Sequence, residues 1–247
     1  MAAERNHPPE NFLDSESVIA HQQWIERIGP ALFSSAATLA VQRYDPGVIL
    51  PAPEDVSLER AVEKRRREFS GGRLAAKFAL EKLGVMNATI PIGKDRSPLW
   101  PDGMVGSITH TAGLAVAVTA RRAEVLALGI DLELAEAVQP ELWPGILTAR
   151  EIKRLEATPA AGRNRVATLL FSAKESFYKM QYPLTRQWVD FQEAEVALNE
   201  GRGEFELICL QPEAVSELRA SAFSGRYATG SDLTITALHL LSTNGQG

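Results

Sequence analysis

Hydrophobic residues recur at helical spacing in three stretches of the chain. The longest stretch, residues 53–83, begins with acidic residues and is followed by Gly84, which suits the position just beyond a helix end. Shorter stretches with the same spacing cover residues 147–157 and 162–181, and the second of these stops before Pro183. The pattern therefore predicts three helices over these ranges.

The amino-terminal region has a weaker pattern. Residues 1–17 are polar and are predicted to form a loose arm. Apolar residues between positions 18 and 41 indicate one or two short helices, interrupted at Gly29 and Pro30 because these residue types favour turns.

Short apolar runs predict the strands. Residues 114–118 and 125–130 flank a polar turn, which is typical of a hairpin. Each half of the chain thus combines a long helix with strands, and we predict two similar α+β units that meet near residue 120. Four further strands are predicted after the last helix, at residues 194–199, 204–210, 224–228 and 233–240.

Composition narrows the class of protein. The 247 residues are 45% hydrophobic and 23% charged, which is ordinary for a globular protein. The net charge of −5 disfavours a general nucleic-acid binder. Cys209 is the one cysteine, so an intrachain disulfide and a cysteine-based zinc site are excluded, and its apolar surroundings predict a buried thiol.

Targeting segments are not evident in this sequence. The first 17 residues lack the apolar region of a secretory signal, and no run of about 18 apolar residues occurs. We therefore expect a cytoplasmic protein without a membrane or nucleic-acid partner.

Basic residues are concentrated in the predicted long helix. Residues 60–77 hold seven basic side chains against two acidic ones, and Arg65, Arg73 and Lys77 fall along one helical face. Such a face is either solvated or binds a polyanion, of which phosphate suits guanidinium groups best. The glycines at 71–72 cost helix stability and indicate close approach of a backbone or a ligand.

Two carboxylates share one face of a predicted strand. In residues 129–133, Asp131 and Glu133 are two positions apart and point the same way. Two such groups can hold Mg²⁺, which takes one or two carboxylates together with substrate phosphates. An amphipathic strand with one wet face has the same pattern, so the segment alone leaves both interpretations open.

A third set of candidate residues lies in the helix predicted over 162–181. Glu175 and Lys179 are one turn apart, as in a helix-stabilising ion pair. The functional interpretation makes Glu175 a metal ligand or a base, with Lys174 or Lys179 near a phosphate. Earlier in the chain, Thr109 and His110 offer hydrogen-bond donors for phosphate oxygens.

Taken together and in this order, these segments resemble the 4′-phosphopantetheinyl transferase superfamily, and most closely its enterobactin-synthetase-activating and mycobacterial-type branch. Each motif is short, but their ordered occurrence over about residues 60–240 is specific. The resemblance is carried by residues 64–69 with Gly72 and Arg73, by 98–110, by 129–133, by Lys174, Glu175 and Lys179, and by 182–185 before Trp188 and Phe191.

The resemblance implies an α+β fold of two similar halves in a pseudo-two-fold arrangement, each a small antiparallel sheet packed on a long helix. The halves would be residues 1–122 and 123–247, with coenzyme A bound in the cleft between them. A closed arrangement of this kind needs no partner chain, so we expect a monomer.

The resemblance also assigns roles to residues of this sequence. Asp131, Glu133 and Glu175 match ligands of Mg²⁺, and Mn²⁺ suits the same oxygen donors. Glu175, Lys174 and Lys179 match catalytic positions, and the two lysines match positions near the pyrophosphate. The other residues expected to contact coenzyme A are Arg65, Arg73, Lys77, Arg96, Thr109 and His110.

The implied reaction has a protein acceptor. A serine hydroxyl of an apo acyl or peptidyl carrier protein would attack the β-phosphate of coenzyme A, with Glu175 accepting the proton directly or through a water. Adenosine 3′,5′-bisphosphate would leave. By analogy with the family, the carrier would dock near Trp143, Leu147 and Leu155, and Glu151 resembles an additional acidic position of some members.

Two other functions use the same features. A magnesium-dependent nucleotide phosphotransferase or hydrolase would employ the same carboxylates, although the glycine-rich phosphate loop typical of many such enzymes does not occur here. A non-catalytic module that binds coenzyme A or a carrier protein would need the basic helix without the Asp131, Glu133, Glu175 and Lys174 set.

Overall fold

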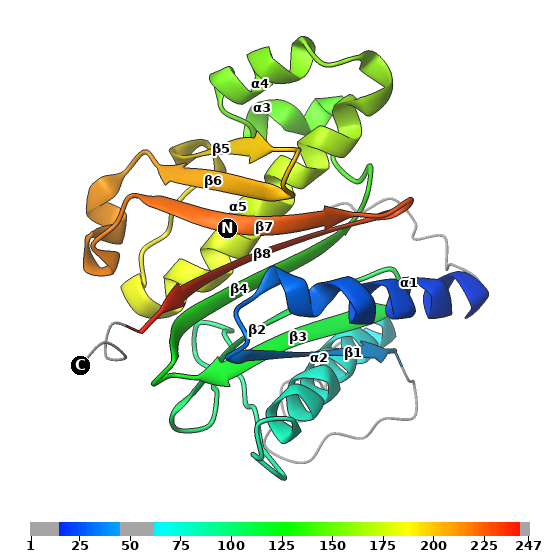
Figure 1. Ribbon diagram of the computed structural model, residues 1–247, viewed down its shortest axis with the longest axis vertical. Helices are drawn as coiled ribbons and strands as arrows, with labels where there is room; N and C mark the ends of the chain where they lie inside the picture. Colours follow the sequence, from blue (N-terminus) through cyan, green and yellow to red (C-terminus); the bar gives the residue numbers. More distant parts are fainter. Residues whose placement is uncertain (1–14, 45–61, 243–247) are drawn as a thin grey trace.

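Two antiparallel sheets form the framework of the protein in a computed structural model that describes residues 15–44 and 62–242 (Figure 1). The smaller sheet has the order β1-β3-β2, with β1 at Ala37–Arg43, β2 at Met104–Thr111 and β3 at Leu114–Arg121. The larger sheet has the order β4-β8-β7-β6-β5. Its strands are β4 (Val125–Leu134), β5 (Ala194–Asn199), β6 (Glu204–Cys209), β7 (Ala222–Thr229) and β8 (Leu233–Leu241).

Helices cover both sides of these sheets, which makes the protein α+β (Figure 1). The helix α2 packs on the smaller sheet, and α5 packs on the larger one against β4 and β8. On the opposite side, α1 contacts β1. The bounds are α1 Ser15–Ile28, α2 Glu63–Glu81, α3 Trp143–Ile146, α4 Ala149–Glu156 and α5 Arg163–Thr185.

Side-chain alternation along β3 explains how the small sheet is covered on two sides. Val116 and Val118 belong to the core that α1 closes, whereas Ala115 and Ala117 belong to the core under α2. The small alanines on the second side let α2 lie close to the sheet. The helix and the sheet thereby place residues of α2 beside the end of β2.

The two sheets meet where β2 lies beside β4 (Figure 1). Hydroxyl groups make the connection: Ser107 Oγ accepts a hydrogen bond from Ile130 N at 3.2 Å, and Thr109 Oγ1 accepts one from Leu132 N at 3.1 Å. These side chains satisfy buried strand amides at a position where a neighbouring strand would otherwise do so. The junction therefore brings Thr109 and His110 beside residues 129–133.

The hairpin predicted between residues 114–118 and 125–130 is wrong. These runs lie in different sheets as β3 and β4, and the hairpin partner of β3 is β2. The β2–β3 turn holds Ala112 at φ 53° and Gly113 at φ 78°, as a tight two-residue hairpin turn requires. Polar residues in β2 weakened the apolar pattern of the true partner, and apolar content alone does not select between sheets.

The helical prediction for residues 18–41 is wrong at its end, because residues 37–41 belong to β1. A short apolar run of this kind fits a strand and a helix equally well, and pairing with β3 decides the outcome. The helix predicted over 53–83 is observed as α2, and residues 53–61 lie outside the described residues.

The last long helix continues beyond its predicted end, through Pro183 to Thr185. Proline removes one hydrogen bond within the final turn, and Arg186 then ends the helix at φ 56° with its amide bonded to the Tyr182 carbonyl at 2.9 Å. The thiol of Cys209 is buried and free, as predicted. In the described ranges, none of the helices has the length and apolar character needed to cross a membrane.

Candidate active site

The strand β4 and the helix α5 come into backbone contact at Gly129. A Cβ atom at this position would lie 1.8 Å from the carbonyl oxygen of Ser176, so only glycine fits. This contact brings the α5 face that carries Glu175 and Lys179 against the strand that carries Asp131. The glycine of the 129–133 segment thus has a steric function in building the site.

Asp131 is the buried centre of the site. Its Oδ1 accepts hydrogen bonds from Lys179 Nζ at 2.6 Å and from Thr109 Oγ1 at 3.2 Å. Its Oδ2 is buried and has no hydrogen-bond partner among the described residues. Because an unpaired buried carboxylate oxygen is costly, this atom marks a position suited to a further donor or a cation.

Lys179 lies within a group of carboxylates. Its ammonium group also donates to the Ile130 carbonyl at 3.2 Å. Burial lowers the pKa of Lys179, but Asp131, Glu175 and Glu133 together raise it above its ordinary value. The structure therefore brings the three predicted metal ligands and Lys179 into one electrostatic cluster.

His110 connects this cluster to the basic helix. Burial first, and then the charges of Lys179 and Arg65, lower its pKa to about 4, against the opposing effect of Asp131. The imidazole is therefore neutral at pH 7. Residues from α2, β2 and α5 thus converge, although they are far apart in sequence.

A cavity of about 550 Å³ opens beside the cluster, between residues 95–108 and the end of α5. Its size is that of a small-molecule site. Arg73, Arg96 and Lys179, all expected to contact coenzyme A, line it. The aromatic part of this wall was not predicted from the sequence: the rings of Tyr178 and Tyr182 stack there with their centroids 5.2 Å apart. The four-residue spacing of these tyrosines on α5 was the signal that could have revealed it.

The basic face of α2 is partly engaged with the protein. Arg73 is buried, donates from Nε to the Ile90 carbonyl at 2.6 Å and lies 4.4 Å above the ring of Phe69. Arg65 is exposed near Glu68, and Lys77 is half-buried. The glycines at 71–72 serve packing, because a Cβ on either would lie 2.9 Å from another side chain.

Thr109, predicted to contact coenzyme A, has protein partners for its hydroxyl group. The side chain is buried, its hydroxyl hydrogen points to Asp131, and its oxygen accepts the Leu132 amide. A hydroxyl has one hydrogen to donate, so Thr109 supports Asp131 instead of facing the cavity.

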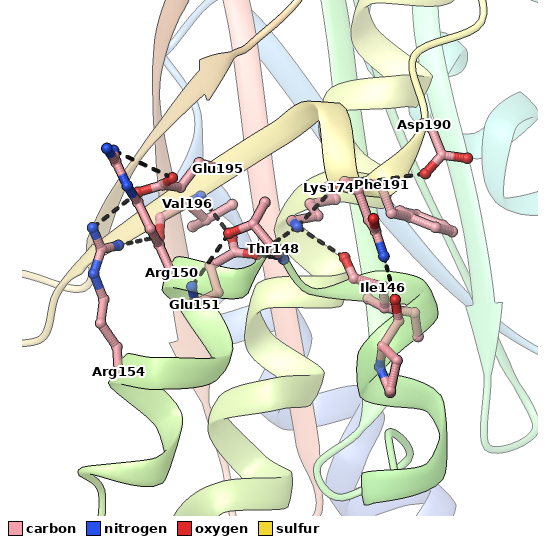
Figure 2. Close-up of polar contacts among 12 residues, drawn as sticks. Ile146, Thr148, Arg150, Glu151, Arg154, Lys174, Asp190, Phe191, Glu195 and Val196 are labelled. Carbon is pink, nitrogen blue, oxygen red and sulfur yellow. Dashed lines mark hydrogen bonds and ion pairs between the residues drawn. The ribbon is translucent and has the colours of Figure 1, made fainter.

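Lys174 is not part of the cluster around Asp131. Its three ammonium hydrogens go to Glu151 Oε2 at 2.6 Å, the Phe191 carbonyl at 2.8 Å and the Ile146 carbonyl at 2.9 Å (Figure 2). An ammonium group has three donors, so none is left for a pyrophosphate. The structure thus places Lys174 in a buried contact within the protein, and its catalytic and phosphate-binding roles stay predictions.

Two of the three residues suggested for carrier docking are buried in the structure. Leu147 and Leu155 are each 1% exposed and belong to the core under α5. Trp143 packs against the same core, while the adjacent Leu142 is exposed. Apolar residues at helical spacing here serve internal packing.

The fit of a divalent cation depends on the oxygen donors near Asp131. Among residues 15–44 and 62–242, no three His, Cys, Asp or Glu side chains are grouped closely enough to hold a metal ion by themselves. Mg²⁺, however, needs only one or two carboxylates when phosphates and waters complete its shell. The unpaired Oδ2 of Asp131 therefore fits such an ion.

Sequence comparisons place the chain among known proteins. Residues 53–120 match the 4′-phosphopantetheinyl transferase N-terminal domain, and residues 127–234 match the 4′-phosphopantetheinyl transferase superfamily. The chain is 38% identical to 4′-phosphopantetheinyl transferase Svp of Streptomyces mobaraensis, over 81% of this chain and 82% of that protein.

The chain is also similar to two further proteins. The chain is 36% identical to 4′-phosphopantetheinyl transferase PptT of Mycobacterium tuberculosis, over 79% of this chain and 88% of that protein. It is 41% identical to enterobactin synthase component D of Salmonella typhi, over 53% of this chain and 54% of that protein. With its two matched regions and the clustered site between its sheets, the chain belongs to the 4′-phosphopantetheinyl transferase superfamily and is an enzyme of the transferase class.

Proposed function

We propose that this enzyme transfers the 4′-phosphopantetheine group of coenzyme A to a serine of an apo acyl or peptidyl carrier protein, with Mg²⁺, and releases adenosine 3′,5′-bisphosphate. The observation that carries the proposal is the ion pair of buried Asp131 with Lys179, which leaves one carboxylate oxygen without a partner among the described residues, beside a cavity lined by cations. This combination suits a ligand that contains both phosphates and a metal ion.

Cationic and neutral donors around the site would bind the phosphates of coenzyme A. Arg73 and Arg96 line the cavity, and Arg65 lies close enough to His110 to lower its pKa. Guanidinium groups match phosphate oxygens in pairs, whereas a neutral imidazole donates one hydrogen bond. Lys77, one turn after Arg73 on α2, would add charge on the same side.

The carboxylates would hold the metal ion. Asp131 offers its unpaired oxygen, and Glu133 and Glu175 belong to the same electrostatic cluster. A bound Mg²⁺ or Mn²⁺ would neutralise the charge that develops on the pyrophosphate. Lys179 remains protonated in this cluster, so it can orient a phosphate oxygen.

The acceptor serine must lose a proton as its oxygen bonds to the β-phosphate. We assign that proton to Glu175, directly or through one water, because it stands on α5 in the same cluster as Lys179. The bond between the β-phosphate and the bridging oxygen breaks, and the bridging oxygen leaves with adenosine 3′,5′-bisphosphate. Serine, phosphate and leaving group are then balanced without any further reactant.

Two other functions remain as outcomes of the test. A phosphohydrolase would use the same carboxylates with water as acceptor, and a binding module would hold coenzyme A without chemistry. The family relationship favours transfer, because two of the relatives named above, Svp and PptT, are themselves described as 4′-phosphopantetheinyl transferases.

The test is intact-mass spectrometry of apo carrier proteins of the fatty-acid, polyketide and non-ribosomal peptide classes, incubated with this protein, coenzyme A and Mg²⁺. We expect a mass gain of one phosphopantetheine group that disappears with a chelator. The variant Glu175→Ala should bind coenzyme A and lose about 100-fold or more in transfer. Activity that survives this change would refute the role of Glu175.

The other results distinguish the alternatives. Coenzyme A binding without a mass gain in any carrier class would identify a binding module. Adenosine 3′,5′-bisphosphate release without a carrier would identify a hydrolase.

A further inference from the structure

The helix α5 is held on two opposite faces. On one face, Ser172 Oγ lies 2.9 Å from Thr236 Oγ1, and that same threonine donates to Ser176 Oγ at 3.2 Å. Since successive helical residues are about 100° apart, Lys174 points to the face opposite these two serines. On that side it makes one buried ion pair and two hydrogen bonds to backbone carbonyls.

Lys174 connects α5 to three neighbouring segments, one through each of its three donors (Figure 2). The carbonyl of Ile146 ends α3, and the carbonyl of Phe191 belongs to the chain that follows α5. The third acceptor is Glu151 on α4. The ammonium group therefore connects the catalytic helix to the end of α3, to α4 and to its own continuation.

Glu151 extends this connection to the larger sheet (Figure 2). Its Oε1 accepts the Val196 amide of β5 at 2.8 Å, and its Oε2 accepts the Thr148 amide at 2.7 Å in the capping box of α4. Side-chain exposure is 1% for Lys174 and 0% for Glu151. Every ionic and polar atom of the pair is thus paired within the protein, and none faces a ligand.

Glu175 and Lys179, which act in the proposed reaction, project from α5 between the face with the two serines and the face with Lys174. Glu175 follows Lys174 directly, and Lys179 stands one turn further along the Glu175 face. A rotation of α5 about its axis would move both away from Asp131. Misplacement of reacting groups by about 1 Å can cost about 100-fold in rate.

We propose that the Lys174–Glu151 pair is a positioning device that fixes the rotation of α5 and thereby aims Glu175 and Lys179 at Asp131. Lys174 then acts through its neighbours and touches neither coenzyme A nor the carrier protein. The inference rests on the proposed function, because it concerns the groups that perform the transfer.

The test is the double variant Lys174→Met with Glu151→Gln, which leaves no unpaired buried charge. Coenzyme A affinity is measured by calorimetry, transfer by intact mass and helix mobility by amide exchange in α5. We expect the dissociation constant for coenzyme A to stay within about threefold, kcat to fall by about tenfold or more, and exchange in α5 to rise. The KM for coenzyme A should change little.

The matched control is Arg154→Met. Arg154 pairs with Glu195 at 2.9 Å and donates to the Val196 carbonyl at 3.4 Å, so these contacts join α4 to β5. Its loss should leave kcat within about twofold. If the double variant does not fold, Glu151→Gln alone, with Lys174 still bonded to both carbonyls, should lower kcat without weakening coenzyme A binding.

Two results would overturn the inference. A double variant with wild-type kcat would show that rotation of α5 does not depend on this pair. Coenzyme A affinity weakened tenfold or more, as expected for Lys179→Met, would make Lys174 a ligand contact. A wild-type protein that transfers nothing would refute the proposed function itself, which separates that failure from the failure of the positioning role.

Discussion

Lys174 and Lys179 are five residues apart on α5, and each pairs with a carboxylate from another element. The two pairs differ in how many of their polar atoms have hydrogen-bond partners in the protein. The distance from Lys174 Nζ to Glu151 Oε2 is 2.6 Å, and the distance from Lys179 Nζ to Asp131 Oδ1 is also 2.6 Å. In the first pair every donor and both carboxylate oxygens have protein partners. In the second, one oxygen of Asp131 is buried without a partner among the described residues, and the lysine side chain is 25% exposed.

The electrostatic surroundings of the two lysines differ as well. Burial lowers the pKa of Lys174, and the nearby carboxylates do not fully offset that effect. For Lys179, three carboxylates outweigh burial and raise the pKa. A pair whose polar atoms all have protein partners stabilises one geometry. A pair with additional negative charge nearby, beside a cavity, is suited to bind a cationic ligand. Composition and spacing alone do not separate the two.

The largest expected effect comes from Gly129→Ala, which removes the contact on which the Asp131–Lys179 pair depends. A methyl group would meet the Ser176 carbonyl, so α5 must move away from β4. We expect transfer to fall by about 100-fold or more and the melting temperature to drop by several degrees. Intact-mass kinetics and thermal unfolding measure both.

The control for this change is Gly145→Ala in α3, where a Cβ would meet nothing within 4 Å. It should leave transfer and stability near wild type. Equal effects of the two substitutions would contradict the steric role of Gly129.

The second prediction concerns Asp131→Asn, which removes the charge but keeps the shape. Transfer should fall by about 100-fold, because charge stabilisation at the reacting phosphates is lost. The rise in melting temperature that Mg²⁺ produces in the wild type should disappear, since the ion binds the folded state through this carboxylate. Exposed Glu141→Gln is the control, and an unchanged Mg²⁺ response in Asp131→Asn would exclude a metal at this residue.

The third prediction tests the Lys174–Glu151 pair by thermal unfolding. Lys174→Met alone leaves the Glu151 carboxylate buried without its cation, which costs about 3–5 kcal/mol and lowers the melting temperature by about 6–20 °C. Arg154→Met breaks a more exposed ion pair and should cost about 1 kcal/mol or less. Similar losses of stability in both variants would show that the buried pair stabilises the protein no more than the exposed pair does.

The smallest expected effect is the pH dependence contributed by His110. Its pKa is about 4 in the folded protein and near 6.5 when unfolded, so the unfolded state binds more protons between these values. Stability from this group is therefore complete above pH 6.5, is lost as the pH falls toward 4 and is constant below. At pH 5 the loss is on the order of 1–2 kcal/mol. The difference between wild type and His110→Gln in urea unfolding measures it, and parallel pH profiles would contradict the prediction.

Several residues that the structure brings together were predictable as neighbours because their chemistry lies in short segments. Asp131 and Glu133 share a strand face, and Glu175 and Lys179 share a helix face, because the periods of these structures are local. The α+β class and the strands of the carboxy-terminal part followed from the same periods. Lys174 has the same kind of local sequence pattern as Lys179, and only its surroundings in the folded protein distinguish the two.

The pairing of strands was not predictable in the same way. The runs at 114–118 and 125–130 are adjacent and apolar, yet they lie in different sheets. Their separation depends on β2, whose Ser107 and Thr109 hydroxyls bond to β4 across the sheet junction. Such contacts join residues more than twenty positions apart and leave no periodic trace.

The sequence by itself determined the kinds of groups present: the basic helix, the paired carboxylates, the Lys-Glu helix and their order along the chain. These depend on residue type and local spacing, which the chain carries directly. Only the tertiary structure decided which lysine lies beside Asp131 and which has all its donors bonded to protein acceptors. That choice depends on which donors and acceptors remain unpaired after packing, and this becomes defined when α3, α4, β5 and α5 come together.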